Sequence, residues 1–202
     1  MIKNIIFDLG NVLLNFKPLE YLNTKISDLE KVQQIYEEVF RSDEWLMLDR
    51  GSITEQEAIN KICSRNTEDG ELIKLVMHNW YLLLTPIKDT VKVLKELKGL
   101  KYKNYLLSNF HLLAYEDVTK RYDFFKYFDG GIVSYKEKLM KPEKDIYKKL
   151  IETFKIHPKE SIFIDDTEEN TVVATKLGFE SILFTNSLDL RKRLIEYKVF
   201  SQ

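Results

Sequence analysis

Short apolar runs recur along the chain, and each stops at a polar or small residue. Continuous apolar runs of this kind suit strands that are buried on both faces. Five runs have this form, and we expect strands at residues 5–7, 105–107, 132–133, 162–164 and 182–184. The residues that follow the first four runs are Asp8, Ser108, Ser134 and Asp165.

Apolar residues recur with helical period between the later strands. Residues 91–97 and 146–151 each place apolar side chains on one helix face, and Val172, Val173 and Leu177 do the same. Strands that alternate with helices in this way form a parallel sheet covered by helices. The pattern therefore predicts an α/β fold with a Rossmann-like, doubly wound parallel sheet as its core.

Residues 15–84 interrupt this alternation because they contain no convincing strand pattern. They carry apolar residues at helical spacing, and Thr54 with Glu57 forms the sequence of a capping box at a helix start. We expect an all-helical cap domain here, inserted after the first strand. The core would then comprise residues 1–14 and 85–202.

The composition limits the class of protein without naming a function. The 202 residues carry 31 Lys and Arg against 32 Asp and Glu, so the net charge of −1 gives no attraction to nucleic acid or membrane. No run of about 18 apolar residues is present, so we expect no membrane span. Cys63 is the only cysteine, which favours a reducing, cytoplasmic location. The sequence does not indicate an oligomeric state.

Polar residues with complementary chemistry follow the predicted strands. Ligands of parallel α/β sheets bind at the carboxyl ends of strands, and four such ends carry Asp8, Ser108, Lys141 and the pair Asp165–Asp166. Carboxylates suit Mg²⁺ and can act as nucleophiles, while a hydroxyl and an ammonium group can hold phosphoryl oxygens. Each residue alone is typical of an ordinary turn. Adjacent carboxylates at a buried strand end repel each other, however, and require a compensating cation or proton.

Four segments resemble, in the same order, the motifs of haloacid dehalogenase-like hydrolases. They are FDLGNVL at residues 7–13, LSN at 107–109, KP with DIY at 141–147, and FIDD with a later asparagine at 163–170. The variant GNVL at 10–13, with LDRG at 48–51, is similar to the subgroup that contains sugar-1-phosphate phosphatases. The set covers most of the chain outside the insertion.

The resemblance implies a role for each matching residue. Asp8 would attack phosphorus and form an aspartyl-phosphate. Ser108 and Lys141 would hold the phosphoryl group, and Lys141 would also steady Asp8. The implied Mg²⁺ ligands are Asp8, the backbone carbonyl of Gly10, Asp166 and, directly or through water, Asp165.

The resemblance also implies which residues contact the substrate. The backbone N–H groups of Leu9 and Gly10 would surround the phosphoryl oxygens, and Asn109 of the second motif joins them. A helical cap in this family closes over the substrate and sets specificity. The cap residues that we expect to face the site are Trp45, Asp49 and Arg50.

Gly10 departs from the pattern of most phosphatases in the family. They carry an aspartate there, which protonates the leaving group, whereas Gly10 has no side chain for that task. His111 could substitute because histidine titrates near neutral pH, although a structural position at a helix start is the more typical role. Without a substitute, turnover should depend steeply on the acidity of the leaving group.

The sequence thus predicts a Mg²⁺-dependent phosphatase that acts on a small phosphorylated metabolite, with sugar phosphates among the candidates. A 2-haloacid dehalogenase would use the same aspartate without a metal, and a phosphomutase would need the acid that Gly10 lacks. A catalytically weak phosphate-binding protein also stays open. A phospho-signalling receiver would place its acidic pair on the first strand and would have no helical cap.

Overall fold

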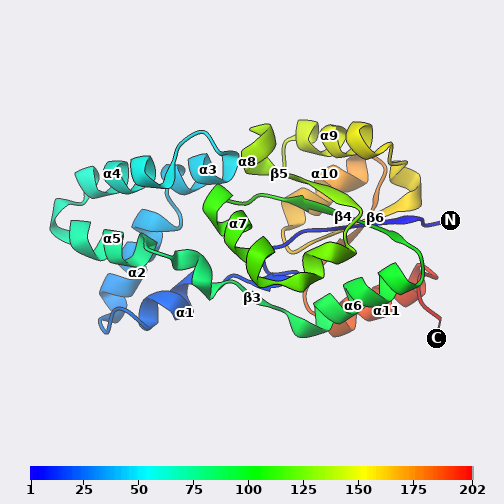
Figure 1. The fold of residues 1–202 in the computed structure, drawn as a ribbon, viewed down its shortest axis with the longest axis horizontal. Coiled ribbons are helices and arrows are strands. Elements are labelled where there is room, and N and C mark those ends of the chain that lie inside the picture. Colours follow the sequence, from blue (N-terminus) through cyan, green and yellow to red (C-terminus); the bar gives the residue numbers. More distant parts are fainter. Residues whose placement is uncertain (202) are drawn as a thin grey trace.

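A five-stranded parallel sheet forms the centre of the protein, whose computed structural model describes residues 1–201 (Figure 1). The strand order is β5–β4–β1–β6–β7, so the first strand lies in the middle. Phe7 of β1 aligns with Leu106 of β4 on one side and with Ile164 of β6 on the other. The five strands are β1 (Asn4–Phe7), β4 (Lys103–Ser108), β5 (Gly130–Val133), β6 (Ser161–Asp165) and β7 (Glu180–Leu183). All five predicted strands are confirmed.

Helices cover both faces of the sheet, as the sequence predicted. Two of them, α9 (Lys144–Phe154) and α10 (Glu168–Lys176), pack on the face that carries Ile6 and Phe163. The opposite face is covered by α6 (Lys88–Gly99) and α11 (Ser187–Glu196), which lie below the sheet in Figure 1. Shorter elements complete the core: α7 (Leu112–Arg121), α8 (Ser134–Glu137), η3 (Asp123–Tyr127) and η4 (Pro158–Glu160).

The buried face of α10 was predicted only in part. Val173 and Leu177 pack partly buried against the core, but Val172 is 42% exposed. The buried residues of the helix are Asn170, Thr171 and Ala174. The polar side chains are buried because the start of α10 packs beside the end of β6, where Asn170 donates a hydrogen bond to Asp165. A search for apolar periodicity misses a helix face that is buried through hydrogen bonds.

The helical insertion, residues 16–84, leaves and rejoins the core through a short antiparallel ribbon of β2 (Leu14–Asn15) and β3 (Thr85–Pro86). The predicted capping box of Thr54 and Glu57 is present. No helix in residues 1–201 has the length and apolar character that a membrane span requires. The helices of the insertion are α1 (Pro18–Asn23), α2 (Leu29–Val39), α3 (Asp43–Arg50), α4 (Glu55–Arg65), η1 (Thr67–Asp69), α5 (Gly70–Met77) and η2 (Trp80–Leu83).

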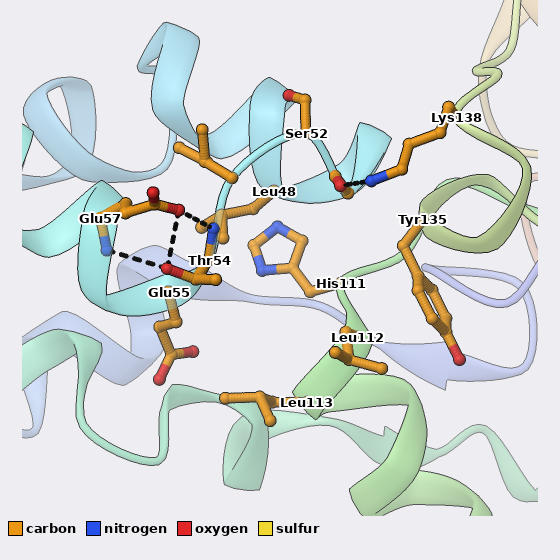
Figure 2. Close-up of a pocket in the computed structure, with 12 residues that line it drawn as sticks. Leu48, Ser52, Thr54, Glu55, Glu57, His111, Leu112, Leu113, Tyr135 and Lys138 are labelled. Atoms are coloured by element: carbon orange, nitrogen blue, oxygen red, sulfur yellow. Dashed lines mark hydrogen bonds between the residues drawn. The ribbon is translucent and has the colours of Figure 1, made fainter.

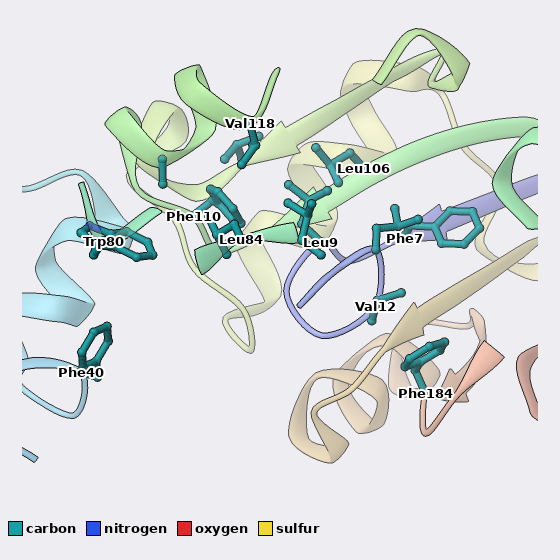
Figure 3. Close-up of a cluster of buried hydrophobic side chains, with 14 of the residues drawn as sticks. Phe7, Leu9, Val12, Phe40, Trp80, Leu84, Leu106, Phe110, Val118 and Phe184 are labelled. Atoms are coloured by element: carbon teal, nitrogen blue, oxygen red, sulfur yellow. The ribbon is translucent and has the colours of Figure 1, made fainter. Parts of the chain in front are cut away.

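One buried hydrophobic cluster connects the helical insertion with the sheet. Phe40 and Trp80 of the insertion belong to the same cluster as Phe7 on β1 (Figure 3). Leu84 and Phe110 lie between these groups in that view, and both are buried. Burying apolar surface stabilises the contact between the two regions, so the insertion is packed against the carboxyl end of the sheet.

Candidate active site

The polar residues predicted from the strand ends meet at one edge of the sheet. Asp8 follows β1 directly, Ser108 ends β4, and Asp165 ends β6. These three side chains and that of Lys141 are buried, although charged groups are seldom buried without partners. Their burial at one edge of a parallel sheet indicates a functional site.

Lys141 joins two of the carboxylates. Its Nζ lies 2.8 Å from Oδ1 of Asp8 and 2.6 Å from Oδ2 of Asp165. Burial acts against the charged ammonium, but the charges of Asp165 and Asp8 outweigh it and raise the pKa of Lys141. The side chain of Asn109 fixes the lysine backbone, because it donates to the Lys141 carbonyl and accepts from the Lys141 N–H, both at 2.9 Å. In this structure the Asn109 amide is a positioning group for Lys141.

Hydrogen bonds orient the two adjacent carboxylates separately. Oδ1 of Asp165 accepts from the Thr167 N–H and from Nδ2 of Asn170, both at 2.9 Å. Asp166 accepts from Nδ2 of Asn11 at 3.1 Å. Asn11 has a φ of 51°, a left-handed conformation that asparagine tolerates better than most residues, and its Oδ1 accepts from the Phe16 N–H. The loop after β1 is therefore tied to the end of β6.

The acidic residues of the site have the arrangement of a cation site. Asp8, Asp165 and Asp166 each offer a carboxylate oxygen, and these oxygens lie within 4.8 Å of one another. Three carboxylates against the one ammonium of Lys141 would leave a net charge of −2. Burial, opposed by Lys141 and reinforced by the neighbouring acids, raises the pKa of Asp8 to about 7, and burial likewise raises that of Asp166. The donor set therefore fits a hard divalent cation such as Mg²⁺.

The backbone of the loop from Leu9 to Leu14 is closely folded. The Leu9 side chain is fully buried, and its carbonyl accepts from the N–H groups of Leu13 and Leu14 at 2.9 and 2.8 Å. A Cβ added at Gly10 would meet no heavy atom within 4 Å, so neither space nor a left-handed backbone requires glycine there. Contacts of Leu9 and Gly10 with a phosphoryl group, and a metal bond from the Gly10 carbonyl, stay predictions.

Aromatic side chains of the helical insertion face Gly10 across a small cavity of about 70 Å³. The ring of Trp45 lies 4.6 Å from that of Trp80 and 4.3 Å from that of His111, measured between centroids. Trp45 thus packs in the core and also lines the cavity. The residues around the cavity are Gly10, Phe16, Trp45, Asp49, Trp80, Leu84, Asn109, Phe110 and His111.

Asp49 and His111 meet at this wall from opposite sides. Oδ1 of Asp49, at the end of α3, lies 3.2 Å from Nε2 of His111, which precedes α7. Burial, reinforced by the charge of Asp8, raises the pKa of Asp49 to about 8. Burial lowers the pKa of His111 to about 3, so its imidazole is neutral at physiological pH. The sequence offered His111 as a substitute acid but favoured a structural position at a helix start. His111 is indeed the N-cap residue of α7, and a buried neutral imidazole is poorly suited to donate a proton.

Arg50 turns away from the cavity wall and contacts the core. It forms an ion pair with Glu143, and its Nη1 also donates to the Lys138 carbonyl at 3.2 Å. Lys138 in turn donates to the carbonyl of Gly51. The geometry gives Arg50 a partner in the core in place of the predicted position facing the substrate.

A second, larger cavity of about 380 Å³ lies along the same seam between the helical insertion and the core. Figure 2 shows the ring of His111 among Leu48, Thr54 and Leu112, which come from both sides of the seam. His111 lines both cavities, so its ring stands between the aromatic wall and this larger groove.

Several residues of the site had no clear signal in the sequence. The hydrogen bonds of Asn11 to Asp166 and of Asn109 to Lys141 join loops that are far apart in the chain. Phe16 and Trp80 lie near the two ends of the insertion in the sequence, and they come together at the cavity only in the folded chain. A spacing argument finds residues that follow strands, but it cannot place side chains from separate helices.

Comparisons with known proteins agree with this geometry. The family description haloacid dehalogenase-like hydrolase matches residues 2–178. A sesquiterpene phosphatase of Aspergillus oryzae is 25% identical over 92% of this chain and 91% of its own. A D-ribitol-5-phosphate phosphatase of Bacteroides thetaiotaomicron is 25% identical over 96% of this chain and 97% of its own.

Solved structures also resemble the fold. A HAD family enzyme from Bacteroides thetaiotaomicron, crystallised with magnesium and inorganic phosphate, has a TM-score of 0.73 and 28% identity over 92% of this chain and 96% of that one. An L-2-haloacid dehalogenase from Xanthobacter autotrophicus shares the fold, with a TM-score of 0.66 and 19% identity over 100% of this chain and 85% of that one. The family match spans most of the sequence and includes every strand-end residue described above. The chain therefore belongs to the haloacid dehalogenase-like hydrolases.

Proposed function

We propose that the protein is a Mg²⁺-dependent phosphatase that hydrolyses a small phosphorylated metabolite through an aspartyl-phosphate on Asp8. The observation that carries this proposal is the buried set in which Lys141 bridges Asp8 and Asp165 while Asp166 stands within the same cluster. A metal-independent dehalogenase would leave the negative charge of this set uncompensated. Two relatives that match this chain over nearly their full length are named as phosphatases, which supports the same choice.

The residues present can carry out a double displacement. An oxygen of the Asp8 carboxylate forms a bond to phosphorus, and the bond between phosphorus and the ester oxygen breaks, leaving its electron pair on that oxygen. Lys141 and Ser108 hold the phosphoryl oxygens as charge shifts toward the leaving group. Water then attacks phosphorus and releases Asp8 as a carboxylate. Mg²⁺, held by Asp8 and Asp166 with Asp165 behind them, would offset the charge of the phosphoryl group.

The cavity wall favours substrates whose organic part is uncharged. No lysine or arginine is among the residues around the cavity next to Gly10, and Asp49 is the one acid there. A second phosphate or a carboxylate on the leaving group would therefore meet no cation at this wall. A sugar or polyol phosphate satisfies this condition, because apolar sugar faces can pack on Trp45 and Trp80, and so does the phosphate ester of an apolar alcohol.

The test is a panel of phosphate esters assayed with Mg²⁺ and after exhaustive chelation. We expect phosphate release that depends on Mg²⁺, with sugar, polyol and apolar alcohol phosphates ahead of esters that carry a second anionic group. Chloride release from a 2-haloacid is measured in parallel. Full phosphatase activity after chelation, or metal-independent chloride release without phosphate release, would contradict the proposal.

A further inference from the structure

The proposed phosphatase reaction needs a proton at the leaving oxygen. In most phosphatases of the family an aspartate at position 10 supplies it, but this chain has a glycine there. Gly10 has no side chain, although the structure has open space where its Cβ would stand. An ester of an ordinary alcohol leaves as a strongly basic alkoxide unless a proton reaches it as the bond breaks. Another group must supply that proton if such esters are substrates.

Asp49, which comes from the helical insertion, lines the same cavity as Gly10. Its side chain is only 17% exposed, and the nearby residue with which it pairs is His111. The charged and titratable groups that face it are Asp8 and Lys141 at the strand ends and His111 before α7. Among the described residues, no lysine or arginine lies within ion-pair distance of this carboxyl group, and the imidazole of His111 beside it is neutral.

The structure holds Asp49 firmly in this position. Its own backbone carbonyl accepts a hydrogen bond from Oγ of Ser134 in the core. The next residue, Arg50, is paired with Glu143, and Gly51 accepts from Lys138. These contacts tie the last turn of α3 to the core on the side away from the cavity, so the carboxyl group is not a freely moving surface acid.

The protonation state of Asp49 suits a donor. Burial of the Asp49 carboxyl group at the cavity wall, without a lysine or arginine in ion-pair distance among the described residues, disfavours its ionised form and raises its pKa, which favours the carboxylic acid. Nε2 of His111 lies 3.2 Å from Oδ1 of Asp49, but neither ring nitrogen has a hydrogen-bond partner among the described residues. A neutral imidazole so close can accept from the acid or donate to the carboxylate that remains after proton transfer, so we expect His111 to position Asp49 during the reaction.

We propose that Asp49 replaces the missing side chain at position 10 as the general acid and base of the phosphatase reaction. In the first step, the bond from Asp8 to phosphorus forms, the ester bond breaks, and the leaving oxygen takes the proton of Asp49. In the second, the Asp49 carboxylate accepts a proton from the water that attacks phosphorus, the bond to Asp8 breaks, and Asp49 is again an acid. This inference rests on the proposed function and assigns the proton transfers within it.

The test measures alcohol release in single-turnover experiments with Mg²⁺, for esters that range from p-nitrophenyl phosphate to glycerol phosphate. Asp49→Asn should lose about 10²–10⁴-fold on glycerol phosphate but only a few-fold on p-nitrophenyl phosphate, whose leaving group needs no proton. Asp43→Asn, an exposed acid on the same helix, is the matched control and should leave both rates unchanged. An equal loss on both esters, or no loss on glycerol phosphate, would overturn the assignment.

A second variant distinguishes the loss of proton transfer by Asp49 from structural damage to the cavity wall. Gly10→Asp in the Asp49→Asn background should recover much of the lost rate on glycerol phosphate, because the space at position 10 is open. His111→Gln should lower the glycerol phosphate rate more than the p-nitrophenyl phosphate rate, and by less than Asp49→Asn does. A stably folded double variant without recovery would count against proton transfer by Asp49. A wild-type protein that hydrolyses none of the esters would instead refute the proposed function itself.

Discussion

The strand-end side of the site and the wall from the helical insertion are held together by different forces. At the strand ends, Lys141, Asp165 and Asn170 are joined by ion pairs and hydrogen bonds of 2.6–2.9 Å. At the wall, Trp45 and Trp80 meet through aromatic packing, with ring centroids 4.6 Å apart. Directional bonds fix the positions of individual atoms, whereas packed rings define a shape. The comparison suggests that the strand ends govern the chemistry common to all substrates and that the wall selects among them.

The largest expected effect comes from removing the nucleophile. Asp8→Asn should fold and should lose several orders of magnitude in turnover for every ester, because the covalent step loses its nucleophile. Steady-state assays of a purified variant measure this. Asp145→Asn, an exposed acid on α9, is the control. Turnover above about a tenth of wild type in Asp8→Asn would end the covalent account.

Removing the ammonium group that bridges Asp8 and Asp165 should have the second-largest effect. Lys141→Ala leaves Asp8 and Asp165 without their partner, so all esters should slow by about 10²–10³-fold, the range for lost electrostatic stabilisation. Loss of one partner from a buried pair should also lower the free energy of unfolding by about 3–5 kcal/mol, measured in urea. Lys148→Ala, on the surface, is the matched control. A loss of rate confined to one ester would show that Lys141 acts in substrate specificity and not in the chemical step.

A change at the wall should act selectively. Trp45→Ala removes a ring that lines the cavity, so the ranking of substrates should change while p-nitrophenyl phosphate hydrolysis stays within about tenfold of wild type, because lost contacts with one organic group cost about 1–3 kcal/mol. Leu46→Ala, an exposed neighbour on α3, should leave the ranking unchanged. A uniform loss for all esters would show that the wall and the strand ends do not divide their roles.

Arg50 should have the smallest effect. Its pair with Glu143 is partly exposed, and such pairs contribute about 0–1 kcal/mol, so Arg50→Ala should lower stability slightly and leave the ranking of substrates unchanged. Glu143→Gln should behave in the same way because it breaks the same pair. The measurement is kcat/KM over the ester panel beside thermal unfolding. If Arg50→Ala changed the ranking of substrates and Glu143→Gln did not, the prediction that Arg50 faces the substrate would hold after all.

The same contrast explains what could be predicted from the sequence. Asp8, Ser108 and Asp165 could be located because each follows an apolar run that forms a strand, and parallel strands bring their ends together. Arg50 could not be placed, since its direction depends on Glu143, which lies far along the chain.

The prediction for the buried face of α10 failed at Val172 for a related reason. Asn170 is buried by its hydrogen bond to Asp165 and not by hydrophobicity, so the periodicity of apolar residues pointed elsewhere. The positions of Trp45, Asp49 and His111 relative to one another likewise follow from tertiary packing, which no spacing rule contains.

The stereochemistry at phosphorus tests the central claim most directly, because it reports a covalent intermediate even when that intermediate never accumulates. The substrate is an aryl phosphorothioate whose phosphorus is made chiral by its sulfur and two oxygen isotopes, hydrolysed with Mg²⁺ in water that carries the third oxygen isotope. Attack by Asp8 followed by attack of water inverts the configuration twice, so net retention is expected in the released thiophosphate. Net inversion would mean that water attacks the ester in a single step, and it would contradict the aspartyl-phosphate on Asp8.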